Sequence, residues 1–192
     1  MDKPLTALAI LCAALISAHA ATPLKNEDFA KGRSGWEGGG KIVFLNDADE
    51  PTPEKEGGKP VLEVKLAKTQ LTEIRQRFVF SHGERSLKTS LQIKTSPDYV
   101  RNDDAHKWTK DISWSGGWYS WSNLVYPRVD FCLRLDGDKF YYLPRNLKTK
   151  GEWVHLKGNF NDMKSAGPKS LSLVFPAGEG TIWVKGLSTS AK

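Results

Sequence analysis

Aromatic side chains are concentrated between residues 107 and 121, where the chain reads KWTKDISWSGGWYSW. The rings belong to Trp108, Trp114, Trp118, Tyr119 and Trp121. Serine, glycine and aspartate separate them, whereas core aromatics usually alternate with aliphatic residues at a period of 2 or 3.6. A Ser-Gly-Gly turn signal in the middle predicts a loop. Exposed tryptophan and tyrosine rings offer rigid contact area, so we predict a recognition surface; the alternative is that two or three rings cap the end of a core.

Polar residues in the predicted strands supply partners for these rings. Arg75 lies in one alternating segment, and Arg128, Asp130 and Tyr141 lie in or beside two others. Arginine binds planar carboxylate or sulfate groups through two parallel hydrogen bonds. We therefore predict a ligand site in which aromatic rings stack on the ligand and the side chains of a strand face bind its polar groups. The alternative is an ordinary solvated strand face with Arg–Asp pairs, each of which stabilises little.

Catalytic chemistry has less support in the sequence. A glycoside hydrolase needs two carboxylates roughly 5 to 10 Å apart. No spacing singles out a pair among the available residues, which are Asp103, Asp104, Asp111 and Asp130. A polysaccharide lyase needs a base beside an arginine, for which His106 or Tyr141 with Arg128 is the available combination. Cys132 lies in a predicted strand without a nucleophile motif. We therefore favour binding without catalysis.

The N-terminal residues predict export. Residues 5–16 are apolar apart from Thr6, and Ala18-His19-Ala20 is a small-x-small cleavage site. The apolar stretch is too short to span a bilayer. We expect a signal peptide over residues 1–20 and a single mature domain over residues 21–192 without a membrane span. The protein would then be secreted, periplasmic or extracellular. Cys132 is the only cysteine left after cleavage, so an internal disulfide is excluded.

The charge balance indicates the chemistry of the partner. The formal net charge is +6 at pH 7. For an exported protein, this excess favours acidic partners such as uronic or sulfated glycans. The basic residues are scattered along the chain, and no nucleic-acid motif accompanies them, so we predict that nucleic acid is not the partner.

Short alternating segments with turn residues between them predict an all-β fold. Helical patterns are almost absent. The expected strands include residues 41–45, 61–66, 70–80, 87–94, 128–135, 140–143, 153–157, 171–175 and 181–185. A long loop without clear secondary structure, over about 95–123, carries the aromatic segment. Eight or nine strands without helical spacers indicate an antiparallel β-sandwich of jelly-roll type.

Several short motifs resemble carbohydrate-binding modules of the family 4/9 and 22 type. Residues 26–29 (NEDF) and Gly35-Trp36 resemble their "N-G-D-F-E … G-W" opening. Residues 87–94 resemble their "Y-x-L-S-x-x-V-K" strand, and residues 151–160 their "W-x-x-V-x-G-x-F" segment. Residues 171–187 are similar to their closing strands. The resemblance implies a galactose-binding-domain-like jelly roll and, as an expectation, sugar binding.

One departure from the family pattern concerns a cofactor. Family members commonly carry a carboxylate near the C-terminal end that joins a structural calcium site, and Lys185 stands in that region here. An ammonium group does not ligate calcium. We therefore expect no cofactor, and we predict that Lys185 pairs with Glu27 or Asp28 in place of the ion. The resemblance also implies structural roles for Trp36 and Trp153.

These observations lead to one favoured function and to alternatives. We expect a secreted, non-catalytic protein that binds a polysaccharide, in particular an acidic glycan, through the aromatic loop and an arginine-bearing strand face. The alternatives are a cell-surface structural or protein-interaction domain, or a small polysaccharide lyase or glycoside hydrolase. Neither the individual glycan nor the oligomeric state follows from the sequence.

Overall fold

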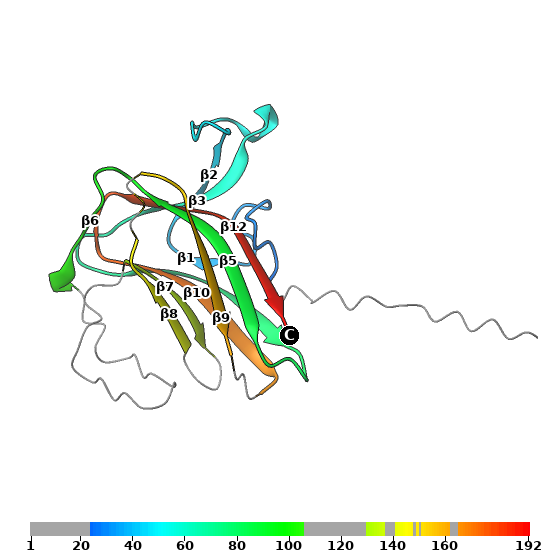
Figure 1. Ribbon diagram of the computed structural model, residues 1–192. Helices are drawn as coiled ribbons and strands as arrows, with labels where there is room; N and C mark the ends of the chain where they lie inside the picture. Colours follow the sequence, from blue (N-terminus) through cyan, green and yellow to red (C-terminus); the bar gives the residue numbers. More distant parts are fainter. Residues whose placement is uncertain (1–23, 106–129, 137–140, 148, 150, 162–164) are drawn as a thin grey trace, which may run out of the picture.

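The computed structural model describes residues 24–105, 130–136, 141–147, 149, 151–161 and 165–192. Within them, two five-stranded antiparallel sheets dominate (Figure 1). Sheet I has the order β1 (Glu37–Gly38), β4 (Thr72–Phe80), β10 (Gly167–Phe175), β7 (Phe131–Asp136) and β8 (Tyr141–Arg145). Sheet II has the order β2 (Lys41–Leu45), β3 (Lys59–Lys65), β12 (Thr181–Ala191), β5 (Leu87–Thr95) and β9 (Val154–Phe160). The all-β, antiparallel sandwich expected from the sequence is confirmed.

The smaller elements lie in the connections. A two-stranded sheet pairs β6 (Val100–Arg101) with β11 (Gly178–Glu179). Short 3-10 helices span Glu54–Glu56 (η1) and Asp103–Ala105 (η2). The prediction of a loop from about residue 95 is therefore wrong for its first part, because β6 and η2 lie there. Elements of two or three residues are too short to produce a readable periodicity.

The hydrophobic core lies between the two sheets because each strand gives one face to it. In β5, Leu87, Leu91 and Ile93 are fully or almost fully buried, while the intervening Lys88 and Gln92 are exposed. The same alternation buries one face of β4 and β12, as the sequence predicts. Aromatic rings fill the centre of the sandwich, with the Phe131 and Phe175 ring centroids 5.3 Å apart. Burial of these apolar faces is the main term that favours folding.

The segment before β1 packs against one side of the core. Trp36 is buried, its ring centroid lies 5.4 Å from that of Phe29, and its Nε1 donates a hydrogen bond to the main-chain oxygen of Asn26 at 3.0 Å. Phe29 adopts a φ of 63°, a conformation that side chains other than glycine rarely adopt. This packing gives Trp36 the structural role expected for it.

Gln76 of β4 attaches this segment to sheet I. The side chain is only 2 % exposed. Its Oε1 accepts a hydrogen bond from the main-chain nitrogen of Lys25 at 2.6 Å, and its Nε2 donates one to the main-chain oxygen of Lys25 at 2.6 Å. The buried amide thus hydrogen-bonds both main-chain groups of Lys25, as a neighbouring strand would.

We predict that Gln76→Ala destabilises the protein by about 2–3 kcal/mol, because it leaves two main-chain groups of Lys25 without these hydrogen bonds and opens a cavity. Urea unfolding monitored by circular dichroism measures the change. Gln92→Ala is the matched control, since Gln92 is exposed on β5, and it should shift the free energy of unfolding by less than about 0.5 kcal/mol. Equal effects of both substitutions would contradict the assignment.

Candidate functional site

The outer face of sheet I carries rows of charged and hydroxyl side chains. On β4, the core residue Ile74 is followed by Arg75, which belongs to the opposite face. Arg75 pairs in register with Ser172 of β10, and Ser172 pairs with Arg134 of β7. The neighbouring row across the same strands consists of Arg77, Ser170 and Asp136. Three adjacent strands therefore bring arginines, serines and a carboxylate onto one surface.

A hydrogen-bonded ion network lies at the centre of this face. Nη2 of Arg134 donates to Oε1 of Glu73 at 2.8 Å and to Oδ2 of Asp136 at 3.2 Å. Ser172 donates to the same oxygen of Glu73 at 2.8 Å, and Ser170 donates to Asp136. The side chains of Arg134 and Asp136 are only 22 % and 19 % exposed. Reduced exposure strengthens these interactions relative to surface pairs and fixes the guanidinium in one orientation.

Arg75, one of the predicted ligand residues, lies toward the β1 edge of the same face. Its Nε donates to Oε2 of Glu37 at 3.1 Å, and Nε of Arg77 lies 3.7 Å from Oε1 of Glu37. The side chains of Arg75 and Arg77 are 42 % and 70 % exposed. Exposed pairs of this kind stabilise the fold little. Both guanidinium groups are consequently accessible to an anionic ligand.

A second cluster surrounds Asp130, where the chain enters β7. Its Oδ1 accepts hydrogen bonds from the hydroxyl of Tyr99 at 2.7 Å and from Nη1 of Arg101 at 2.8 Å, and its Oδ2 accepts one from the main-chain nitrogen of Leu147 at 2.6 Å. Arg101 also pairs with Asp103. Burial first, and then the hydrogen bond to Asp130, raise the pKa of Tyr99 far above its usual value. We call Tyr99, Arg101 and Asp130 the clamp.

The clamp joins two described stretches of the chain. Arg101 lies near the end of the stretch that closes at residue 105, and Asp130 begins the next described stretch. The 2.8 Å contact between Arg101 and Asp130 therefore holds these two stretches, which flank residues 106–129 in the sequence, against each other. The Arg101–Asp130 contact adjoins β7 of sheet I, and Arg134 of β7 lies on the outer face of that sheet.

Most of the predicted ligand residues belong to the sequence range 106–129. The predicted residues outside the described part of the chain are Trp108, Trp114, Trp118, Tyr119, Trp121 and Arg128. Tyr141 begins β8 and pairs in register with Leu135, whereas Tyr142 pairs with Arg134. The backbone of Tyr142, and not that of the predicted Tyr141, therefore lies opposite Arg134.

Two residues predicted to face away from the core are buried instead. Asp130 is 7 % exposed and Cys132 is 2 % exposed. The burial of Asp130 is explained by its three hydrogen-bond donors, Tyr99, Arg101 and the main-chain nitrogen of Leu147, which satisfy the carboxylate inside the fold. Burial raises the pKa of the Cys132 thiol to about 12. At neutral pH the thiol is protonated, so it does not act as a nucleophile.

The predicted partner of Lys185 is wrong. Its Nζ lies 3.6 Å from Oδ1 of Asp49 and 3.9 Å from the centroid of the Trp153 ring. Glu27 accepts instead from the main-chain nitrogen and the hydroxyl of Thr189, both at 2.7 Å.

A β-bulge explains the difference. The register of β12 against β5 shifts between Lys185 and Ser188, with Gly186 at a φ of 59°. Lys185 pairs in register with the exposed Gln92, on the outer face of sheet II, while Thr189 follows the bulge and is buried. Glu27 therefore contacts β12 beyond the bulge, on the face opposite to that of Lys185, and Asp28 accepts from the main-chain nitrogen of Ala30.

Asp49 joins the connection after β2 to sheet II. Nζ of Lys94 lies 3.0 Å from its Oδ2, and Nε1 of Trp153 donates to its carboxylate at 2.7 Å. Burial works to raise the pKa of Asp49, but the hydrogen bonds from Lys94 and Trp153 and the charge of Lys185 outweigh it and hold this pKa below its usual value. Trp153 thus has the structural role expected for it.

Two further features are absent from the described part of the chain. Among the described residues, no group of three or more His, Cys, Asp or Glu side chains is placed to hold a metal ion. No helix within the described ranges has the length and apolar character needed to cross a membrane.

Sequence reasoning missed part of the network on sheet I, namely Glu73, Ser170, Ser172 and Asp136. The alternation in residues 169–174 (KSLSLV) places both serines on the face opposite the core, and this signal was available. The pairing of β10 with both β4 and β7 was not available, because the three strands are far apart in the sequence.

Comparisons with known proteins bear on the fold. No protein-family model and no curated protein matches the sequence. The solved structure of TmCBM61 in complex with beta-1,4-galactotriose is similar, with 11 % identity, a TM-score of 0.53, and coverage of 90 % of this chain and 99 % of that one. The enzymatically active domain of bacteriophage CBA120 tailspike protein 4 is 9 % identical with a TM-score of 0.53, and covers 89 % of this chain and 21 % of that one. The fold of this chain is therefore that of a carbohydrate-binding-module jelly roll.

We predict that Asp130→Ala destabilises the protein by about 2–4 kcal/mol, because it removes one of the two carboxylates that pair with Arg101 and also removes the acceptor for the Tyr99 hydroxyl and the Leu147 main-chain nitrogen. Thermal and urea unfolding measure the loss. Asp98→Ala is the matched control, since Asp98 is exposed in the neighbouring turn, and it should leave stability unchanged within about 0.5 kcal/mol. A stability of Asp130→Ala equal to that of the control would rule out the clamp.

Proposed function

We propose that this chain is a secreted, non-catalytic carbohydrate-binding protein that takes an acidic glycan through the aromatic segment 106–129 and the outer face of sheet I. The observation that carries the proposal is the clamp. It joins the two described stretches that flank residues 106–129, which contain four of the seven tryptophans, and it adjoins a sheet that presents arginines on its outer face. Aromatic rings and arginines next to one another are the combination that an acidic sugar requires.

The arginines of sheet I support the acidic specificity. Arg75 and Arg77 are exposed and share a single carboxylate, Glu37, so their combined charge exceeds that of their partner. The net charge of +6 adds a long-range attraction for polyanions. The fold supports sugar binding in general and not the acidic specificity, since the similar TmCBM61 structure is in complex with the neutral sugar beta-1,4-galactotriose.

The geometry favours a sugar over a protein as partner. A protein-docking surface requires a contiguous apolar patch. The large exposed apolar side chains among the described residues are Leu71, Val79 and Val100. Leu71 and Val79 lie at opposite ends of β4, separated by about 25 Å at roughly 3.3 Å per residue. The outer face between them is polar.

Catalysis through paired carboxylates has little support in the described residues. Asp103 and Asp130, two of the candidate acids, both pair with Arg101. Asp130 accepts hydrogen bonds from Tyr99 and Leu147 as well. A carboxylate engaged in this way contributes to the structure and is poorly placed to transfer a proton to a substrate.

We predict that polygalacturonate or dextran sulfate produces a saturable change in intrinsic tryptophan fluorescence, and that Trp118→Ala and Trp121→Ala abolish or strongly reduce it. Arg75→Ala should weaken the affinity roughly tenfold, because one charge-assisted hydrogen bond contributes about 1.5 kcal/mol. Reducing-sugar release, measured in the same mixtures, should stay at the background level.

Arg85→Ala is the matched control for Arg75→Ala. Arg85 is an exposed arginine in the turn after β4, away from the strands that carry the proposed site, and its loss should leave the affinity unchanged. No fluorescence change with acidic or neutral polysaccharides, or equal losses for the two arginine variants, would contradict the proposed site. Release of reducing sugar by the wild-type protein would contradict the non-catalytic assignment.

A further inference from the structure

A carboxylate of the protein itself occupies a basic site on the outer face of sheet II. Lys94 of β5 and Lys185 of β12 lie on this face beside the ring of Trp153. Nζ of Lys94 is 3.0 Å from Oδ2 of Asp49, and Nζ of Lys185 is 3.6 Å from its Oδ1. Nε1 of Trp153 is 2.7 Å from each of the two oxygens. Two ammonium groups and one indole N–H thus converge on a single carboxylate. We call Lys94, Lys185 and Trp153 the carboxylate site.

The site belongs to the sheet, whereas its occupant is carried by a turn. Asp49 lies in the turn after β2, which has hydrogen bonds of its own. Oδ1 of Asn46 accepts from the main-chain nitrogens of Ala48 and Glu50, both at 2.9 Å, and the main-chain oxygen of Asn46 accepts from that of Asp49 at 3.1 Å. Asp49 takes no part in the strand pairing of sheet II. Its carboxylate can therefore leave the site without breaking a strand register.

Charge and exposure suit the site to a carboxylate from outside as well. The side chains of Lys94, Lys185 and Asp49 are 21 %, 30 % and 24 % exposed. Partial exposure strengthens an ion pair relative to one in open water, yet it leaves the site in contact with solvent. The two ammonium groups also outnumber the one carboxylate between them. The site consequently keeps a positive charge that attracts an acidic ligand.

A further tryptophan, Trp183 of β12, lies next to the carboxylate site. In register it pairs with Lys94 on one side and with Glu63 of β3 on the other. Its Nε1 donates to Oε2 of Glu63 at 3.1 Å, and Glu63 also pairs with Lys41 at 2.9 Å. These contacts hold the indole, which is partly exposed, on the outer face of the sheet. An indole offers a flat apolar surface against which a sugar ring can pack.

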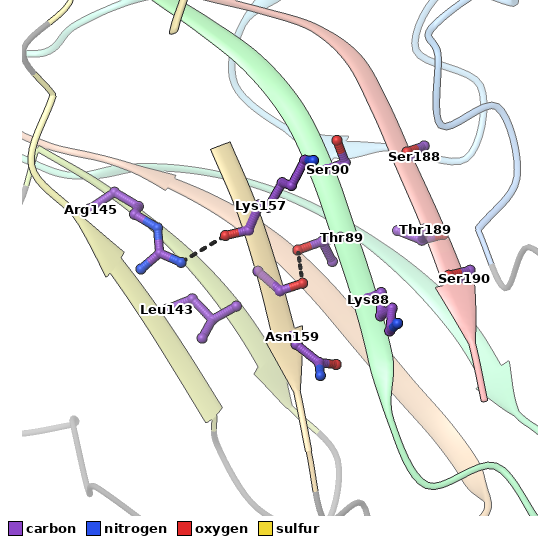
Figure 2. A pocket seen from close by; sticks show the side chains of 11 residues that line it. Lys88, Thr89, Ser90, Leu143, Arg145, Lys157, Asn159, Ser188, Thr189 and Ser190 are labelled. Atoms are coloured by element: carbon purple, nitrogen blue, oxygen red, sulfur yellow. Dashed lines mark hydrogen bonds between the residues drawn. The ribbon is translucent and has the colours of Figure 1, made fainter. Parts of the chain in front are cut away.

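The outer face of sheet II continues from the site in polar side chains. Lys185 pairs in register with Gln92, and Gln92 pairs with His155. The next two rows across β12, β5 and β9 consist of Ser188, Ser90 and Lys157, and of Ser190, Lys88 and Asn159 (Figure 2). Alcohols and amides both donate and accept hydrogen bonds, as the hydroxyl groups of a sugar require. A saccharide held at the carboxylate site therefore meets hydrogen-bonding groups along the sheet.

We propose that the carboxylate site binds the carboxylate of a uronic acid residue, which displaces Asp49, the occupant in the free protein. Asp49 competes at the high effective concentration of a group on the same chain. A simple carboxylate therefore displaces it poorly, whereas a uronate whose ring packs on Trp183 gains a contact that Asp49 lacks. The inference rests on the proposed function for the class of ligand, but it concerns the opposite sheet of the sandwich.

The first test follows the indole Nε1–H signal of Trp153 in the mature chain by ¹⁵N–¹H NMR during a titration with trigalacturonate. We expect a saturable shift, because Nε1 exchanges the oxygens of Asp49 for those of the ligand. Neutral galactotriose at equal concentration should shift this signal at least about tenfold less, since it brings no charge-assisted hydrogen bond. A Trp153 signal that stays in place at every attainable concentration of trigalacturonate, or that moves equally with galactotriose, overturns the inference.

Removal of the internal occupant is the second test. Asp49→Ala should raise the affinity for trigalacturonate, measured at Trp153, by at least about tenfold, because the site is then free in every molecule. Asp47→Ala is the matched control: Asp47 is exposed on the same turn, pairs with Lys59 and carries the same charge, so its loss leaves the site filled. Equal gains in the two variants overturn the inference, since only net charge would then matter.

Two further variants keep this test decisive. Asp49→Asn retains an acceptor oxygen for Trp153 but loses the charge, so it should also raise the affinity, and it replaces Asp49→Ala if thermal melting shows that the latter is unfolded. Lys94→Gln with Lys185→Gln, added to the Asp49 variant, should weaken the affinity at least about tenfold. Retention of full affinity without the two lysines overturns the site.

The same titrations separate this inference from the proposed function. Trigalacturonate that shifts the Nε–Hε signal of Arg75 while the Trp153 signal stays in place overturns the carboxylate site and leaves the sheet I site intact. A saturable shift of Trp153 that persists in Arg75→Ala and Trp118→Ala supports the carboxylate site independently of sheet I.

Discussion

The structure depends on the burial of one apolar face from each of two five-stranded sheets. Cys132, the cysteine in the described part of the chain, is a free thiol, so the sandwich is stabilised by packing and hydrogen bonding and not by a bridge through it. Strand alternation follows from this constraint, because a slip by one residue would turn every core side chain outward. The same constraint decides which residues are available for function. Ile74 of β4 faces the core, and the next residue, Arg75, therefore faces outward.

Two polar clusters then determine what the outside presents. On sheet I, Arg134 is held between Glu73 and Asp136, so a charged surface is kept in one arrangement by its own ion pairs. At the entrance to β7, the contact of Asp130 with Arg101 joins chain segments that are distant in sequence. Half-buried charges of this kind are poor sources of net stability but good determinants of geometry. A binding face requires such fixed geometry.

Much of the fold could be predicted from the sequence, because alternation is a local property. The alternation of apolar and polar residues predicts which face of β4, β5 and β12 is buried. The family resemblance implies the structural roles of Trp36 and Trp153. Asp130 and Lys185 could not be predicted, because their partners come from distant segments. Asp130 accepts hydrogen bonds from Tyr99 and Leu147, and the bulge at Gly186 turns Thr189, the partner of Glu27, to the face opposite Lys185.

We propose above that the outer face of sheet I and residues 106–129 bind an acidic glycan together. The most direct measurement is an NMR titration with an acidic oligosaccharide that follows the arginine Nε–Hε and tryptophan Nε1–H signals, which report on side chains one by one. We expect saturable shifts, with one common dissociation constant, for Arg75, Arg134 and the indoles of residues 108–121. Indole shifts that saturate without any change at Arg75 and Arg134, or no indole shifts at all, would contradict it.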